Sequence, residues 1–200
     1  MTRNHTPMMT TAPRLPAPLN VLRHGVTEPN LAGLRCGGDL DVELTDLGRR
    51  QAIEAALRIR ELRLPVGLIV TSPLLRTSAT AQLVSRVLGG VGLLVEAGFS
   101  ERRLGQWNLQ PVADTEAALA AGETPPGGEP DAEFVARIER ALEGLLPHLD
   151  RQPLLVGSKG VVRAIGEVLG AVHRGPLGNG QLAHFDLAAF AARRSLAVPP

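Results

Sequence analysis

The sequence predicts an α/β fold of three layers, in which a mostly parallel central sheet is covered by helices on both faces. Short apolar segments typical of buried strands alternate along the chain with longer segments whose apolar residues recur at helical spacing. Several of the short segments are apolar at nearly every position, which is typical of strands that are covered from both sides. The 200 residues are enough for one domain with a full core, and we place that domain at residues 19–200.

Five segments are predicted to be strands because each is short and rich in aliphatic residues. They cover residues 19–23, 66–72, 91–96, 153–157 and 181–187. The fourth leads into a turn bounded by Gly157 and Gly160. The last alternates apolar and polar residues, which also favours a strand.

Five further segments are predicted to be helices because their apolar residues recur every three or four positions. They cover residues 46–62, 74–88, 112–121, 131–149 and 161–170. The first begins after Thr45, whose hydroxyl suits an N-cap, and it carries Asp46 in its first turn. Residues 24–44 and 98–108 are predicted to be long loops, and 121–130 a turn-rich linker.

Composition excludes several classes of protein. The 21 basic and 20 acidic residues give a net charge of +1, which argues against a broad electrostatic contact with nucleic acid or an anionic membrane. No apolar run approaches the 18 or so residues that a membrane span needs. One cysteine excludes an intrachain disulfide and favours a cytoplasmic location. Residues 1–18 carry four prolines and no apolar period, so we expect a disordered tail.

The ends of the predicted strands carry the chemistry. In a parallel α/β sheet, ligands bind beyond the carboxyl ends of the strands. The loops at those ends hold cations around one histidine and one glutamate, namely Arg23, His24, Arg76, Glu101, Arg102, Arg103 and Lys159. Arginine matches phosphate oxygens with two donors, a histidine can accept a phosphoryl group, and a carboxyl group can protonate a leaving oxygen. The sequence therefore predicts a site for a phosphate ester, and Arg35, Arg102 and Arg103 suggest a second anionic group on it.

Five ordered motifs resemble the histidine phosphatase superfamily, which includes the cofactor-dependent phosphoglycerate mutases. Residues 22–30 (LRHGVTEPN) resemble its RHGxTxxN signature, and residues 44–52 (LTDLGRRQA) resemble its LTxxGxxQA motif. Residues 71–81 (TSPLLRTSATA) are similar to its SPLxRxxxTA, and residues 101–107 (ERRLGQW) to its ExxxGxW. Residues 128–137, with a Gly-Glu pair followed by a phenylalanine and an arginine, resemble its GE…F..R helix.

The resemblance implies a role for each matched residue. His24 would be the nucleophile that becomes phosphohistidine, and Glu101 would protonate the leaving group and later activate water. Arg23 and Arg76 would bind the phosphate oxygens, and Asn30 would add a hydrogen bond from the opposite wall. No metal and no cofactor is implied, because arginines and backbone N–H groups would stabilise the charge.

The sequence departs from the family at the second motif histidine. That histidine lies in a run similar to VSHGGVIRA, whereas residues 156–164 are VGSKGVVRA. Ser158 takes the place of the histidine, and Lys159, the only lysine of the chain, takes that of the first glycine. We hypothesise that Ser158 and Lys159 together replace the histidine in phosphate binding. The other histidines of the predicted domain are His148, His173 and His184. We expect each of them to be a surface or partly buried structural residue.

The leading hypothesis is a phosphatase that hydrolyses a small phosphorylated metabolite through a phosphohistidine on His24. The family's mutases are longer, with insertions that enclose the substrate, whereas residues 109–130 are short here. Two alternatives stay open: a catalytically weak or inactive protein that binds a phosphate ester for regulation, and a phosphomutase or phosphotransferase on the same scaffold. A homodimer is allowed, since sheet-edge dimers occur in the family. Glu129 is assigned an electrostatic role near a helix start, and Cys36 an unreactive place in a loop or wall.

Overall fold

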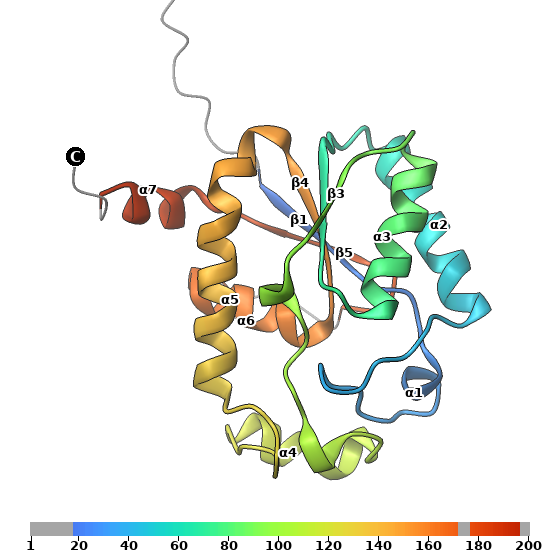
Figure 1. Ribbon diagram of the computed structural model, residues 1–200, viewed down its shortest axis with the longest axis vertical. Coiled ribbons are helices and arrows are strands. Elements are labelled where there is room, and N and C mark those ends of the chain that lie inside the picture. The colour runs from blue at the N-terminus through green and yellow to red at the C-terminus, as the bar shows by residue number, and fades with distance from the viewer. Residues whose placement is uncertain (1–17, 172–176, 197–200) are drawn as a thin grey trace, which may run out of the picture.

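The predicted sheet is present in the computed structural model, which describes residues 18–171 and 177–196 (Figure 1). Its strands are β1 (Leu19–Arg23), β2 (Leu68–Thr71), β3 (Leu93–Val95), β4 (Pro153–Gly157) and β5 (Leu182–Phe185). They lie in the order β3-β2-β4-β1-β5, and only β5, at one edge, runs antiparallel to its neighbour. The tail predicted for residues 1–18 lies, apart from residue 18, outside the described residues.

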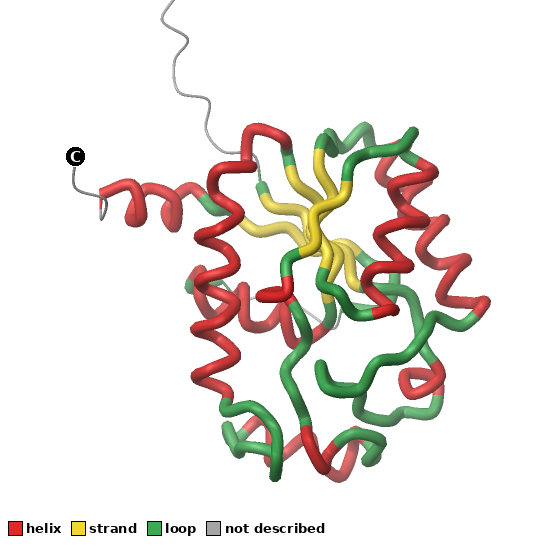
Figure 2. The backbone as a smooth tube through the Cα atoms, viewed as in Figure 1, coloured by secondary structure: helices red, strands yellow, loops and turns green. Residues whose placement is uncertain are grey.

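Helices cover both faces of this sheet, as predicted (Figures 1 and 2). On one face lie α2 (Asp46–Glu61) and α3 (Leu75–Val87), and on the other lie α5 (Asp131–Leu145) and α6 (Lys159–Leu169). Strand β1 shows why two layers form, because alternate residues point to opposite faces. Val21 joins the core beneath α5 and α6, whereas Leu22 joins the core beneath α2 and α3, and both are fully buried.

The connections contain several short elements that the sequence analysis assigned to loops. They are α1 (Glu28–Leu31), η1 (Ala97–Phe99) and η2 (Gly105–Trp107). Helix α4 (Val112–Ala120) also lies in these connections, and it was predicted. In Figure 1, α1 and α4 lie below the sheet, at the end toward which the parallel strands lead. This end is where the sequence places the functional residues.

Strands β2, β3 and β5 are shorter than predicted, two helix boundaries differ, and one helix was not predicted. Helix α5 ends at Leu145 rather than 149 and continues as the 3-10 helix η3 (Leu146–Arg151), since Pro147 has no N–H to donate to the preceding turn. Helix α6 begins at Lys159 rather than 161. The first N–H groups of a helix have no intrahelical acceptor, so the helix can include Gly160 in its first turn. Helix α7 (Ala188–Leu196) was not predicted.

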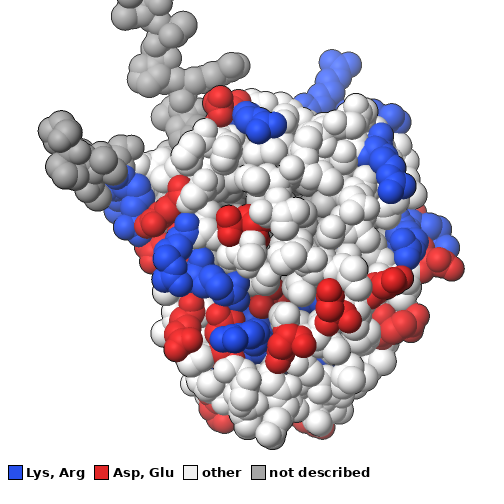
Figure 3. Space-filling model, viewed as in Figure 1, with Lys and Arg blue, Asp and Glu red and all other residues white. Residues whose placement is uncertain are grey.

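In the described part of the chain, no helix is both long enough and apolar enough to cross a membrane. On the face drawn in Figure 3, acidic and basic side chains of the described residues are interspersed.

Candidate active site

His24 follows β1 directly, and its surroundings hold it as a neutral ring. The residue is 4% exposed, and its Nδ1 lies 2.7 Å from the carbonyl oxygen of Gly25. A carbonyl oxygen only accepts, so Nδ1 carries the proton and Nε2 carries the free electron pair. Burial, followed by the charges of Arg76 and Arg23, lowers the pKa of His24 to about 3. The ring is therefore neutral at pH 7 and has an electron pair on Nε2 that is available to an electrophile.

The loop after His24 is fixed by contacts that explain two of the sequence motifs. Gly25 donates its N–H to Thr80 Oγ1 at 3.2 Å, and Val26 donates its N–H to Gln51 Oε1 at 2.8 Å. The loop also crosses the first turn of α2 so closely that a Cβ on Gly48 would lie 2.2 Å from the carbonyl oxygen of Val26. Glycine at position 48 is thus required for this crossing, and the motif residues keep the nucleophile in place.

Two arginines whose charges act on His24 form no ion pair with a described residue. Arg76 is 1% exposed and donates to the carbonyl oxygens of Leu40 (3.0 Å) and Gly37 (3.1 Å). Arg23 donates to the carbonyl oxygen of Leu177 at 2.6 Å. No carboxylate of the described residues lies within ion-pair distance of either guanidinium. Arg76 is a buried cation without a counterion, and the half-buried Arg23 is influenced only by the charge of Glu101 outside ion-pair distance, so this pair suits a ligand that brings negative charge.

Unsatisfied polar atoms gather at the same place. Over the described ranges, three buried side-chain nitrogen or oxygen atoms lack a hydrogen-bond partner: Arg23 Nε, Thr27 Oγ1 and Ser158 Oγ. All three residues lie in or after the carboxyl ends of β1 and β4, which are neighbours in the sheet, with Arg23 opposite Gly157. Buried polar groups are normally paired, so three orphans in one region indicate a place for a polar ligand. Thr27 was missed by the sequence analysis, although it is the threonine of the first motif.

Glu101 reaches the start of α6. Its Oε1 accepts the N–H of Arg102 at 2.7 Å, and its Oε2 accepts the N–H of Gly160 at 2.9 Å. A Cβ on residue 160 would lie 2.1 Å from Oε1, so only glycine leaves room for the carboxylate. Because Gly160 follows the Ser158-Lys159 pair, Glu101 lies beside the loop that follows β4. The side chains predicted for acid–base work and for phosphate binding are thus neighbours.

The loop that carries Glu101 is held by the fifth motif. Arg137 donates to the carbonyl oxygens of Gly98 (2.8 Å) and Ser100 (2.9 Å) and binds both carboxylate oxygens of Glu129 at 3.0 and 2.8 Å. Glu129 is 4% exposed, and although burial would raise its pKa, the bonds from Arg137 lower it. The electrostatic role predicted for Glu129 is therefore that of a partner to Arg137, and the pair supports the loop.

Ser158 and Lys159 differ in their exposure. Ser158 is 3% exposed and precedes α6 next to His24, whose N–H donates to the carbonyl oxygen of Gly157 at 2.9 Å. Lys159 is exposed, and its side chain forms no hydrogen bond or ion pair with a described residue. The orphan hydroxyl of Ser158 is thus already in place, whereas the Lys159 ammonium is free to turn.

The other histidines lie away from this edge. His148 is on η3, which precedes β4 and so adjoins the opposite end of the sheet. His184 is on β5, and its Nδ1 lies 2.5 Å from Asn20 Oδ1. His173 lies outside the described residues. The structural positions assigned to the first two agree with these contacts.

The expected binding of a second anion by three arginines needs correction. Arg102 is 4% exposed and bound to the carbonyl oxygens of Glu129 and Glu123 and to the Asp131 carboxylate. Arg35 forms an ion pair with Glu116 at 2.5 Å. Both arginines are occupied by structural partners. Of the three, only the exposed side chain of residue 103 has no described partner.

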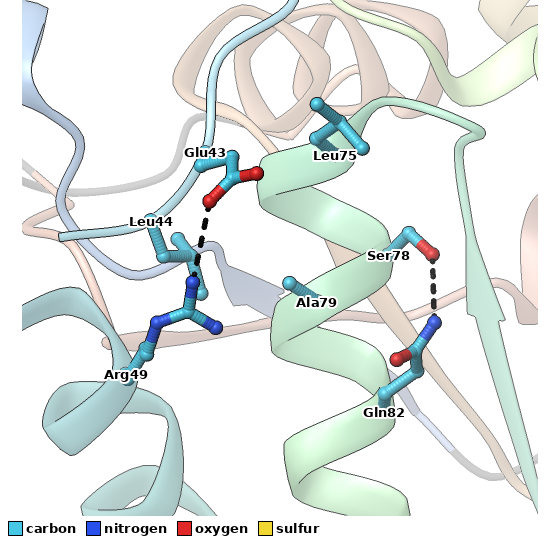
Figure 4. Close-up of a pocket in the computed structure, with 7 residues that line it drawn as sticks. All are labelled: Glu43, Leu44, Arg49, Leu75, Ser78, Ala79 and Gln82. Carbon is cyan, nitrogen blue, oxygen red and sulfur yellow. Dashed lines mark hydrogen bonds and ion pairs between the residues drawn. The ribbon is translucent and has the colours of Figure 1, made fainter. Parts of the chain in front are cut away.

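Two further features add no chemistry. Cys36 is half-buried, and burial raises the pKa of its thiol, in keeping with the wall position predicted for it. A shallow pocket lies between the start of α2 and α3 (Figure 4). Its polar contacts are an exposed pair of Glu43 and Arg49 and a bond from Gln82 to Ser78, both 3.4 Å long. None of the residues predicted for catalysis lines it.

The family of the chain follows from comparison with known proteins. The sequence model of the histidine phosphatase superfamily, branch 1, matches residues 19–191. The chain belongs to this superfamily. The resemblance drawn from the five motifs is therefore confirmed.

Similar members of the superfamily are phosphatases and mutase-like proteins. The glucosyl-3-phosphoglycerate phosphatase of Mycobacterium tuberculosis (strain H37Rv) is 34% identical over 169 residues, which cover 76% of this chain and 74% of that protein. An acid phosphatase from the same strain is 34% identical over 143 residues, 71% of this chain and 70% of that protein. Phosphoglycerate mutase-like protein 4 of Arabidopsis thaliana is 31% identical over 165 residues, 76% of this chain and 70% of that protein.

Solved structures show the same fold. The structure of mycobacterial glucosyl-3-phosphoglycerate phosphatase with VO3 has a TM-score of 0.72 at 30% identity and covers 84% of this chain and 90% of that one. The predicted phosphoglycerate mutase-like fold is confirmed. The prediction of a phosphoric monoester hydrolase agrees with the family and with the activities in the relatives' names.

Proposed function

We propose that this histidine phosphatase hydrolyses a small phosphorylated metabolite through a phosphohistidine on His24. The Nε2 atom attacks phosphorus, and the bond from phosphorus to the ester oxygen breaks while Glu101 gives that oxygen its proton. Glu101 then takes a proton from water, whose oxygen attacks the phosphohistidine. Inorganic phosphate leaves, and His24 returns to its neutral form. The observation that carries this proposal is a neutral, buried histidine whose pKa is lowered by the charges of two arginines, neither of which forms an ion pair with a described carboxylate.

The phosphate cradle consists of Arg23, Asn30, Arg76, Ser158 and Lys159. The two guanidiniums supply positive charge that is already in place before the transition state, which is the efficient form of electrostatic catalysis. The Ser158 hydroxyl is buried and unpaired, so a phosphate oxygen is the partner it lacks. Lys159 adds a cation from the exposed rim. No step of this mechanism passes through a metal or a cofactor.

The substrate class is a phosphate monoester with a small leaving group. Because mycobacterial relatives are named glucosyl-3-phosphoglycerate phosphatases, glucosyl-3-phosphoglycerate is the first compound to test. The cytoplasmic location, the homodimer, and the lack of nucleic-acid or membrane partners remain predictions.

A second candidate function is binding or regulation without turnover. It is favoured by Ser158, which offers a hydroxyl where the family pattern has a histidine. Loss of one preorganised donor lowers the rate by about 10²–10³. A phosphotransferase would differ from both in passing the phosphoryl group to an acceptor other than water.

The deciding experiment compares phosphate release from p-nitrophenyl phosphate between pH 5 and 8 for the wild type, His24→Ala and the control His148→Ala. We expect turnover and a trapped phosphohistidine in the wild type and in the control, and neither in His24→Ala. If the wild type releases no phosphate from this ester or from a metabolite panel, yet binds vanadate, the protein is a binder.

Lys159 is tested separately by the affinity for inorganic phosphate and for vanadate. Lys159→Ala should weaken both severalfold, and Lys159→Arg should retain most of the affinity because it keeps the charge. An unchanged affinity in Lys159→Ala would remove this residue from the cradle.

A further inference from the structure

The segment 177–181, just before β5, packs against the loop that carries His24, and none of its residues was among the predicted site residues. Arg23 donates its Nη1 to the carbonyl oxygen of Leu177 at 2.6 Å and its N–H to that of Gln181 at 3.0 Å. Gly180 returns its own N–H to the carbonyl oxygen of Arg23 at 3.0 Å. Hydrogen bonds near both ends of the segment therefore hold it against the end of β1.

Asn179, in the middle of this segment, uses both protons of its amide on the site. Its Nδ2 donates to the carbonyl oxygen of His24 at 3.0 Å and to Asn30 Oδ1 at 3.2 Å. The two acceptors lie about 150 positions away along the chain (155 and 149). One amide thus joins the nucleophile to a residue of the predicted cradle.

Backbone groups determine which way both amides face. Asn30 Oδ1 also accepts the N–H of Thr27 at 3.2 Å. A backbone N–H only donates, so the Asn30 atom that faces it must be oxygen. At the other end, the carbonyl oxygen of His24 only accepts, so the Asn179 atom that faces it must be nitrogen. Flipping either amide would set donor against donor or acceptor against acceptor.

The orientation leaves Asn30 with one free group. Its Oδ1 holds two donors, one for each lone pair, and its Nδ2 has no partner among the described residues. We propose that Asn179 is a positioning residue, which saturates Asn30 Oδ1 and so presents Asn30 Nδ2 to the phosphoryl group. This inference rests on the proposed function, because it assigns the bound phosphate as the acceptor that Nδ2 lacks.

Removal of Asn179 should act through Asn30. In Asn179→Ala, the Asn30 oxygen keeps the N–H of Thr27 as its only donor, so the amide is held less firmly and can turn its nitrogen away from the phosphate. In Asn179→Asp, a carboxylate of nearly the same shape lacks both protons and faces two acceptors, so the effect should be larger. Both variants leave the residues that contact the phosphate unchanged.

The test is a double-mutant cycle with full-length protein, read out as the dissociation constants of inorganic phosphate and of orthovanadate. Asn179→Ala should weaken both about three- to tenfold in the wild-type background, as expected for one lost hydrogen bond. In the Asn30→Ala background the same substitution should have no further effect. Gln82→Ala, which removes an exposed amide on α3, is the matched control and should bind as the wild type does.

Two results would overturn the proposal: an unchanged affinity in Asn179→Ala, or an equal loss with and without Asn30, since a purely structural role acts in both backgrounds. If Asn179→Ala does not fold, Asn179→Asp takes its place in the same cycle. Failure of the proposed function is distinguishable, because a wild type that binds both anions without hydrolysing esters leaves the cycle intact. A wild type that binds neither anion overturns both.

Discussion

Substitution of Gly160 by alanine separates catalysis from stability. The new Cβ would lie 2.1 Å from Glu101 Oε1 and 2.8 Å from its Cδ, so the carboxylate must swing away and lose its 2.9 Å bond to the N–H of residue 160. That bond to a charged group contributes about 1.5–3 kcal/mol, whereas alanine inside a helix is favoured over glycine by about 1 kcal/mol. We therefore expect the free energy of unfolding to fall by no more than about 2 kcal/mol.

The effect on catalysis should be larger. Displacement of an acid–base group by about 1 Å can lower the rate about 10²-fold. A poor leaving group such as an alkoxide depends on the proton from Glu101, whereas p-nitrophenolate leaves almost without it. Single-turnover phosphorylation of His24 should therefore slow about 10²-fold with an alkyl phosphate in Gly160→Ala, and by less than about tenfold with p-nitrophenyl phosphate.

The assay is rapid-quench phosphoenzyme formation with both esters, accompanied by urea unfolding. The matched control is Gly144→Ala, because residue 144 is an exposed helical glycine with no atom within 4 Å of a new Cβ. The control should gain up to about 1 kcal/mol in stability and keep both rates. An equal slowing with the two esters, or no slowing, would refute the role of Gly160 in placing Glu101.

Three further predictions concern stability. Burial and then the charge of Arg76 lower the pKa of His24 to about 3, so below about pH 6.5 the unfolded chain takes up a proton that the folded chain does not. Unfolding measured at pH 7 and 4.5 should show wild type losing about 2–3 kcal/mol more than His24→Ala, and equal losses would contradict the shift. Arg137→Met leaves the buried Glu129 carboxylate without its ion-pair partner and should lower the free energy of unfolding in urea by about 3 kcal/mol. Addition of Glu129→Gln should restore part of this loss. A loss below about 1 kcal/mol would argue against this pair. Burial would raise the pKa of Asp39, but hydrogen bonds from the loop at η2 lower it. Asp39→Asn should therefore lower the free energy of unfolding by about 0.5–1 kcal/mol at pH 7, and this difference from the wild type should vanish as acid protonates the wild-type carboxylate below about pH 4. A difference that stays constant with pH would exclude this cause.

The layers could be predicted from the sequence because burial imposes a regular spacing of apolar residues along each strand and helix. A strand covered on both faces is apolar throughout, as at residues 68–71, and an amphipathic helix repeats every three or four positions, as at 131–145. The candidate nucleophile and its arginines could also be located, since parallel strands end at one edge of a sheet. The end of α5 was misplaced because apolar spacing continues past Pro147, where the helical hydrogen bonds change.

Adjacent arginines show what the sequence could not decide. Arg102 is buried against Asp131 and two carbonyl oxygens, whereas Arg103 is exposed, although both follow Glu101 in the same loop. Their difference in burial depends on which side of the loop faces α5. A loop has no regular spacing of apolar residues from which this side could be predicted. The assignment of Arg102 to a second anion was wrong for that reason, whereas that of Arg103 stays a prediction.

The amino-acid sequence by itself determined the fold class and the family and located the candidate residues His24, Arg23, Arg76 and Glu101, because hydrophobic period and motif spacing are local properties. The tertiary structure alone decided that Asn179 meets Asn30 and that Gly160 makes room for Glu101. These pairs are 149 and 59 positions apart, and each depends on donor and acceptor directions that exist only after the sheet has brought the segments together.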